Sequence, residues 1–236
     1  MLEVKELSCG YGNDTIVKNV SFSVKDGEIL SITGPNGCGK TTLLRALCGI
    51  IPYKSGSALI GGKEIRSMSR EELSANAALL SQTGAGGEYS DFTVRETVAL
   101  GRYAKSKVFG SDKADEAAAE EYMKKTDTLP IADSVITELS GGQLQRVLLA
   151  RAFAQEPKII FLDEPANHLD LKRQIELIEM LKGWAANGKS VVGVFHDLNL
   201  AAELSDRIMV MNGGRTEILD SAENVCRSEK LNEIYG

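Results

Sequence analysis

The chain is poor in the residues that build disulfide frameworks and metal centres. It has four cysteines and two histidines among 236 residues, and no two cysteines form a C-x-x-C pair or a zinc-binding spacing. Cys38 and His168 together make no zinc set either. We therefore expect a cytosolic chain with reduced thiols rather than a disulfide framework. The cysteines are Cys9, Cys38, Cys48 and Cys226.

Long apolar runs and an excess of basic residues are also absent. No run approaches the roughly 18 apolar residues of a membrane span, and residues 1–6 alternate and carry charge, unlike a signal peptide. The formal net charge is −6, so we expect no nucleic acid partner. Any role at a membrane is expected to come through a partner protein. A content of 43% hydrophobic and 25% charged residues is that of a globular chain with one large core.

A glycine-rich segment carries the clearest chemical signal. It follows the strand-like run 28–32 and opens the helix-like run 43–47, the context that identifies a phosphate-binding loop. Glycines let successive backbone N–H groups point at one anion, and the following helix adds its positive end. We expect Lys40 to reach the β- and γ-phosphates of a nucleoside triphosphate and the Thr41 hydroxyl to hold magnesium. The loop is Gly34-Pro35-Asn36-Gly37-Cys38-Gly39-Lys40-Thr41-Thr42.

The order of strand-like and helix-like segments predicts an α/β fold. Between residues 82 and 139 we expect no strand, which indicates a helical insertion. Residues 212–214 are expected to turn a hairpin between strand-like runs at 208–211 and 216–219. The other expected strands are 2–7, 21–24, 28–33, 56–60, 77–80, 158–163 and 190–195, and the expected helices are 41–50, 70–74, 93–105, 112–126, 171–186 and two short ones within 221–235.

A second candidate anion site stands at Ser140-Gly141-Gly142-Gln143, before an amphipathic helix. Ser140 is a good N-cap, and the pair of glycines exposes backbone N–H groups. A capped helix start alone does not need two glycines, which weaken a helix by roughly 1 kcal/mol each. We therefore expect something to approach this backbone closely.

Taken in order, these motifs resemble those of the ATP-binding subunits of ABC transporters. Leu139–Gln143 resembles the family's signature motif, and Ile159–Pro165 resembles Walker B with its catalytic glutamate. Tyr11 resembles the aromatic residue that stacks on adenine, Gln82 the Q-loop glutamine, 166–170 the D-loop and His196 the switch histidine. The resemblance covers essentially the whole chain. It implies a P-loop NTPase fold with a RecA-like, mainly parallel core, an N-terminal antiparallel β subdomain and an inserted α-helical signature subdomain. The expected single domain, 1–236, has its core at 1–82 and 156–236 and its helical subdomain at about 83–155.

The resemblance also implies a role for each polar residue of the site. Asp163 would hold magnesium with Thr41 and Gln82, and Glu164 would be the general base that polarises the attacking water. His196 would contact the γ-phosphate, while His168 would be an interface residue of the D-loop. Cys38 would contribute its N–H, and the helix N-terminus is expected to lower the pKa of its thiol. ATP and Mg²⁺ are the implied cofactors.

In this family the signature of one subunit covers the ATP held by the other, so the resemblance implies a homodimer or a pair with a similar ATPase. It also implies transmembrane permease subunits, indirectly a substrate-binding protein, and a peripheral place on the cytoplasmic side of the membrane. The segments 91–102, 196–202 and 231–236 resemble ATPases for iron-siderophore, haem and cobalamin uptake. The coupling helix of the permease would then dock near Tyr89–Phe92.

Three positions depart from that subfamily. Ser81 replaces a usual proline, residues 83–87 are irregular, and Leu144 replaces a polar residue. Two alternatives stay open: the ATPase of a metal-ion or other ABC importer, and a soluble ABC ATPase such as an iron–sulfur assembly factor. The sequence does not name the cargo, because the ATPase does not touch it.

Overall fold

The computed structural model describes residues 1–81, 91–105, 113–167 and 169–235. Its centre is a six-stranded sheet in the order β10-β9-β3-β8-β7-β6. The five strands from β9 to β6 run parallel, and β10 pairs antiparallel with β9. Every residue of β3, β7 and β8 is buried, as expected for central parallel strands. The strands are β3 (Ile29–Thr33), β6 (Ala77–Leu80), β7 (Ile159–Asp163), β8 (Ser190–Val194), β9 (Arg207–Asn212) and β10 (Arg215–Ser221).

A second, four-stranded antiparallel sheet has the order β2-β1-β4-β5. Its strands are β1 (Leu2–Cys9), β2 (Val17–Val24), β4 (Tyr53–Ile60) and β5 (Lys63–Glu64). Apolar side chains from this sheet, from the central sheet and from helix α1 (Lys40–Leu47) form one core cluster. The helix that follows the phosphate loop is therefore fixed by burial between two sheets.

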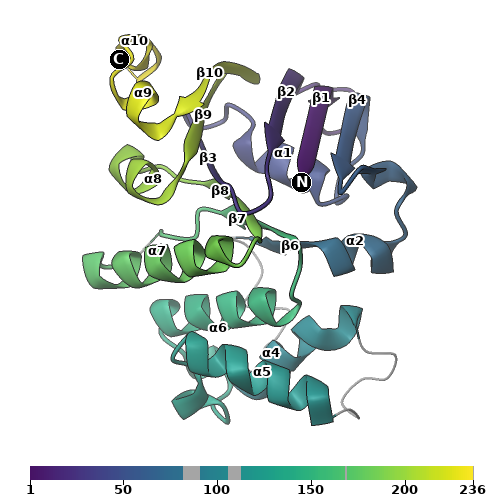
Figure 1. The fold of residues 1–236 in the computed structure, drawn as a ribbon, viewed down its shortest axis with the longest axis vertical. Coiled ribbons are helices and arrows are strands. Elements are labelled where there is room, and N and C mark those ends of the chain that lie inside the picture. The colour runs from purple at the N-terminus through teal and green to yellow at the C-terminus, as the bar shows by residue number, and fades with distance from the viewer. Residues whose placement is uncertain (82–90, 106–112, 168, 236) are drawn as a thin grey trace.

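Helices α4 to α10 pack in a second core cluster, on the other side of the central sheet, whereas Leu73 of α2 packs against the first cluster. Helices α4, α5 and α6 lie together at one end of the molecule, while α9 and α10 lie at the other end (Figure 1). The helices are α2 (Arg70–Asn76), α4 (Val94–Ala99), α5 (Lys113–Lys125), α6 (Gly141–Ala154), α7 (Leu171–Ala186), α8 (Leu198–Leu204), α9 (Ala222–Cys226) and α10 (Lys230–Tyr235). Short 3₁₀ turns span Ile65–Ser67, Leu100–Ala104, Leu129–Ile131 and Ile136–Glu138.

Most of the expected elements are present, with shifted ends. The helix expected at 93–105 is α-helical only to Ala99 and continues as a 3₁₀ helix, η2 (Leu100–Ala104). Strand β2 begins at Val17 and β4 at Tyr53, earlier than the expected starts at 21 and 56. Within residues 91–105 and 113–139, the parts of this segment that the structure describes, the only β pairing is an isolated bridge from Thr93 to Val135, in keeping with a helical insertion. None of the described helices is long and apolar enough to span a bilayer.

Candidate nucleotide site

The phosphate loop joins β3 to α1 at the edge where the parallel strands end. Gly34 has a φ of 144°, and a Cβ there would lie 2.1 Å from the Met211 carbonyl oxygen, so only glycine fits the turn. Gly37 and Gly39 also have positive φ angles, of 78° and 106°. Asn36 and Gly37 are exposed at the tip, while Thr42 is buried behind it. The loop thus turns its backbone outward from a buried base.

Lys40 lies across this loop. Its side chain is buried, and Nζ donates hydrogen bonds to the carbonyl oxygens of Gly34, at 2.7 Å, and Pro35, at 3.0 Å. Among the described residues, no carboxylate forms an ion pair with this buried ammonium at the positive end of α1, an arrangement suited to an anion. The loop and Lys40 therefore fit a triphosphate.

Cys38 lies beside Lys40, with Sγ 3.9 Å from Nζ. Burial raises the pKa of the Cys38 thiol, and the nearby Lys40 charge only partly offsets this. The expectation that the helix N-terminus lowers this pKa is therefore wrong, because the loop folds the thiol inward and removes it from water.

Two oxygen donors meet beside the loop. The Thr41 hydroxyl donates to Asp163 Oδ1 at 3.0 Å, where Asp163 ends β7. Asp163 is buried, and burial raises the pKa of its carboxyl group. A hydroxyl and a carboxylate are ligands that Mg²⁺ accepts together with phosphate oxygens and water. Among the residues that the structure describes, no group of three or more His, Cys, Asp or Glu could hold a metal alone.

Glu164 and His196 come together because β7 and β8 are neighbours. Glu164 directly follows β7, has a φ of 56°, and accepts contacts on both carboxylate oxygens. Oε1 meets His196 Nε2 beyond the end of β8, and Oε2 accepts a hydrogen bond from Asn167 Nδ2. The sequence motifs predicted Glu164 as the general base and His196 as the residue that contacts the γ-phosphate. They did not predict that the Asn167 side chain, in the following loop, donates a hydrogen bond to Glu164.

Tyr11 contacts α1, the helix that follows the phosphate loop. The Tyr11 residue is 42% exposed, and its hydroxyl accepts a hydrogen bond from Nη1 of Arg45, on α1, at 2.9 Å. The exposed ring leaves a face for a base to stack on. Arg45 was not singled out from the sequence, since a basic residue inside a helix gives no such signal.

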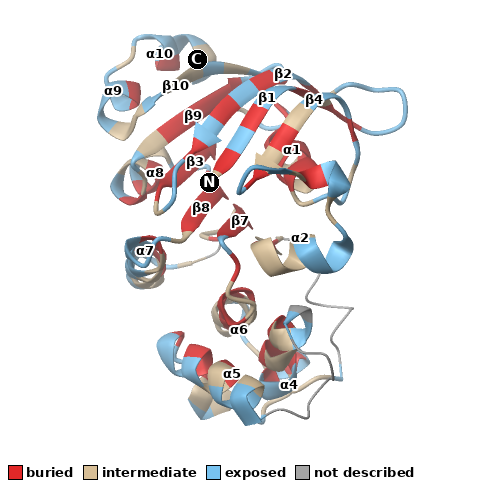
Figure 2. Ribbon diagram, turned by 45° about the vertical axis from the view of Figure 1, so that its right-hand side comes forward, coloured by how far each residue is buried: buried red, intermediate tan, exposed pale blue. Residues whose placement is uncertain are grey.

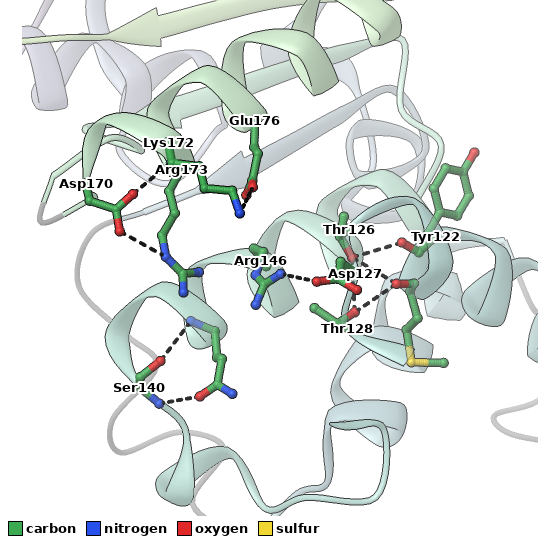
Figure 3. Close-up of polar contacts among 12 residues, drawn as sticks. Tyr122, Thr126, Asp127, Thr128, Ser140, Arg146, Asp170, Lys172, Arg173 and Glu176 are labelled. Carbon is green, nitrogen blue, oxygen red and sulfur yellow. Dashed lines mark hydrogen bonds and ion pairs between the residues drawn. The ribbon is translucent and has the colours of Figure 1, made fainter. Parts of the chain in front are cut away.

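Ser140 caps α6 with a reciprocal pair of hydrogen bonds. Ser140 N–H donates to Gln143 Oε1 at 2.9 Å, and Gln143 N–H donates to Ser140 Oγ at 3.4 Å. A Cβ on Gly142 would lie 3.0 Å from Arg173 Nη1 of α7, whereas one on Gly141 would meet no atom of the described residues within 4 Å. Figure 3 shows Ser140 at the start of α6 with Arg173 reaching toward it from α7, beside Asp170.

The two candidate anion sites do not merge within one chain. In the described residues, Ser140 and Gln143 bond each other rather than the loop at 34–42. Helix α6 lies with α4 and α5, apart from α1 and the four-stranded sheet (Figure 2). The Q-loop candidate Gln82 and the D-loop residue His168 lie outside the described residues.

The site lies where adjacent parallel strands end. It combines the glycine-rich loop and Lys40 with two neighbouring carboxylates, Asp163 and Glu164, and with His196, and this combination defines a P-loop nucleotide-binding protein. The family model described as ABC transporter matches residues 17–167, and the chain belongs to this family. The expected P-loop fold, with a mainly parallel core, an antiparallel N-terminal sheet and added helices, is confirmed.

The chain is 40% identical over 237 residues to the uncharacterized ABC transporter ATP-binding protein YvrA of Bacillus subtilis, covering 99% of this chain and 53% of that protein. It is 35% identical to the ferric enterobactin transport ATP-binding protein FepC of Escherichia coli, covering 100% of this chain and 87% of FepC. The chain thus spans about half of YvrA and most of FepC. Among solved structures, the dimeric post-hydrolysis state of the ATP-binding cassette MJ0796, bound to ADP and Pi, is 29% identical with a TM-score of 0.83, covering 94% of this chain and 99% of that one.

Proposed function

We propose that this chain is the ATP-binding and ATP-hydrolysing subunit of an ABC importer. The observation that carries the proposal is the Glu164 carboxylate, held by His196 and Asn167 one residue beyond Asp163 and its Thr41 partner. A carboxylate aligned beside a metal-binding pair and an anion loop is what hydrolysis of a phosphoanhydride needs. A site built only to bind nucleotide would not require it.

Each residue then has one task. The loop amides of 34–42 and the Lys40 ammonium bind the phosphate oxygens, and Tyr11 stacks on the adenine. Thr41 and Asp163, with Gln82, hold Mg²⁺, which neutralises phosphate charge when it is bound. Glu164 accepts the proton of the attacking water, and His196 orients this water and the γ-phosphate.

The working unit is a dimer, a homodimer or a pair with a similar ATPase, in which Ser140–Gln143 of one copy cover the ATP of the other. The exposure of Ser140 and Gly141 supports this, since no described atom lies within 4 Å of a Cβ built on Gly141 and a second copy therefore has room to approach. The dimeric MJ0796 cassette supports it too.

The cargo is an iron chelate, haem or a cobalamin-like molecule, carried by separate permease subunits and delivered by a binding protein. This rests on the likeness to FepC and on the segments 91–102, 196–202 and 231–236. The subunit sits peripherally on the cytoplasmic side of the membrane. One domain spans 1–236, with a core at 1–82 and 156–236 and a helical subdomain at about 83–155 that transmits movement to the permease.

Phosphate release tests the proposal. Magnesium-dependent ATP hydrolysis is expected in the parent, with loss of nucleotide binding in Lys40→Ala. Glu164→Gln should slow turnover by roughly 10²-fold or more and accumulate an ATP-bound dimer on gel filtration. A Glu164→Gln variant that hydrolyses ATP at the parent rate, or that stays monomeric with ATP and Mg²⁺, contradicts the assignment. Co-purification with a polytopic membrane protein separates transport from a soluble role.

A further inference from the structure

The C-terminal helix reaches the base of the phosphate loop. Helix α10 is anchored by Leu231, which is buried in the larger core cluster, and by Ile234, which packs against it. This places Tyr235 against the end of β3, although 202 positions separate it from its partner there. No local sequence pattern signals such a contact.

The contact is a hydrogen bond between two hydroxyl groups. Tyr235 Oη lies 2.7 Å from Oγ1 of Thr33, which is the last residue of β3 and only 1% exposed. A buried hydroxyl costs free energy unless it finds a partner. The tyrosine supplies that partner at the point where the strand becomes the phosphate loop.

The next residue belongs to the loop itself. Partial burial of the phenol at this contact raises the pKa of Tyr235, although hydrogen bonds from the Thr33 hydroxyl and the Gly34 amide favour the ionised form and offset part of the shift. The hydroxyl therefore stays protonated and able to donate at neutral pH. The carbonyl oxygen of the same Gly34 accepts the Lys40 ammonium at 2.7 Å. One peptide unit thus stands between the tyrosine contact and the lysine contact.

Packing alone does not hold the ring in place. The Tyr235 residue is 47% exposed, and on one side it borders a cavity of about 510 Å³ that His196 and Leu198 also line. With space beside the ring, the hydroxyl contact is what fixes its tip against the loop.

We propose that Tyr235 is a positioning residue for ATP binding, holding the strand-to-loop joint through the Thr33 hydroxyl so that Gly34 and Lys40 are aligned before phosphate arrives. This deepens the proposed function and rests on it. Loss of the Tyr235 hydroxyl should weaken the affinity for nucleotide, because the connection between Thr33 and Gly34 sets the shape of the phosphate loop and takes no part in phosphoryl transfer.

Tyr235→Phe keeps the ring and deletes the hydroxyl. In the full chain we expect the Kd for a fluorescent mant-ATP and the KM for ATP to rise about three- to tenfold, the usual size for one lost hydrogen bond. The kcat should stay within about twofold. Thr33→Val should give the same change, Thr33→Ser should restore the parent values, and the double variant should be no worse than either single one.

Tyr122→Phe is the matched control, because it deletes a phenol that bonds Glu156 in the helical part, away from the loop. It should leave KM unchanged. Unchanged KM and Kd in Tyr235→Phe, or equal losses in Thr33→Ser and Thr33→Val, overturn the proposal. The proposal is also overturned if the increases in KM and Kd from Tyr235→Phe and Thr33→Val add up in the double variant. If the parent itself neither binds nor hydrolyses ATP, the proposed function fails instead.

Discussion

Glu164 combines a strained backbone with a fully engaged side chain. A positive φ is uncommon for a residue with a Cβ and costs of order 1 kcal/mol. That conformation turns the carboxylate back across the end of β7, where His196 and Asn167 meet its two oxygens. The motif identified the residue, but its conformation follows from tertiary contacts.

Glu156 provides a residue-scale test of stability. Burial alone would raise the pKa of its carboxyl group, but hydrogen bonds and charges from Lys105 and Arg102 lower it to about 2. Because this pKa lies below its ordinary value near 4.3, the contact stabilises the fold above about pH 4.3 and is lost as the pH falls toward 2.

Glu156→Gln should therefore lower the free energy of unfolding at pH 7 by about 1 kcal/mol, a figure reduced for the partial exposure of the group. At pH 2 to 3 the difference from the parent should shrink. Urea unfolding at both pH values measures it, with the exposed Glu179→Gln as control. A deficit that is equal at both pH values would show that the carboxylate charge is not involved.

At the scale of elements, the two glycines at the start of α6 have different surroundings and need different explanations. Gly142 makes room for the Arg173 side chain of α7 in the same chain, whereas a Cβ on Gly141 would have no neighbour in the part of the chain that the structure describes. The sequence predicted that something approaches the backbone at these two glycines. Arg173 of the same chain accounts for Gly142 but not for Gly141. In the proposed dimer, Gly141 would be the glycine that a second copy approaches.

Gly141→Ala separates folding from dimer formation. The free energy of unfolding should be unchanged or increase by up to about 1 kcal/mol, because alanine favours helix and no atom lies near the new Cβ. In the Glu164→Gln background, the ATP-dependent dimer should be lost or weakened. Thermal unfolding and gel filtration measure the two effects. A stable variant that dimerises as well as its parent would argue against a partner's ATP at Gly141.

Elements with strong local patterns were predictable from the sequence. The buried strand β7 and the helix at 171–186 were expected almost to the residue, since continuous apolar runs and helical periodicity are local. The strand starts at Val17 and Tyr53 were missed because pairing with β1 extends them. The contacts of Arg173 with Gly142 and of Tyr235 with Thr33 depend on three-dimensional packing, so no residue pattern revealed them. The contact of Asn167 with Glu164 is local, three residues apart, but an asparagine in a turn gives no signal of its own.

At the scale of the whole molecule, the helical segment joins two neighbouring strands. Strands β6 and β7 pair in parallel, and the chain between them contains α4, α5 and α6. Ser140–Gln143 are therefore carried by a part of the molecule that lies apart from α1 and the four-stranded sheet (Figures 1 and 2). This arrangement favours completion of the site between two copies.

A complementation experiment tests that arrangement. Lys40→Ala removes the loop cation, and Ser140→Arg places bulk and charge at the start of α6; each variant alone should be inactive. In a mixture, one site of the mixed dimer combines the intact loop of the Ser140→Arg chain with the intact α6 start of the Lys40→Ala chain. Phosphate release should then recover, up to about a quarter of the parent rate if pairing is random and the two sites act independently. No recovery would mean that both halves must lie in one chain.

The strand order also constrains how the chain acquires its shape during synthesis. Strand β3, which leads into the phosphate loop, pairs with β8 and β9. Ile29 pairs with Val191 and Leu30 with Arg207, so β3 cannot pair until these later residues have been synthesised. The antiparallel sheet of β1, β2, β4 and β5 can assemble from the first 64 residues, yet β3 cannot. Most of the polypeptide must therefore be synthesised before the phosphate loop is anchored and nucleotide can bind. Until then the apolar residues of β3, Ile29, Leu30 and Ile32, lack the strands that bury them in the native sheet and are prone to aggregation.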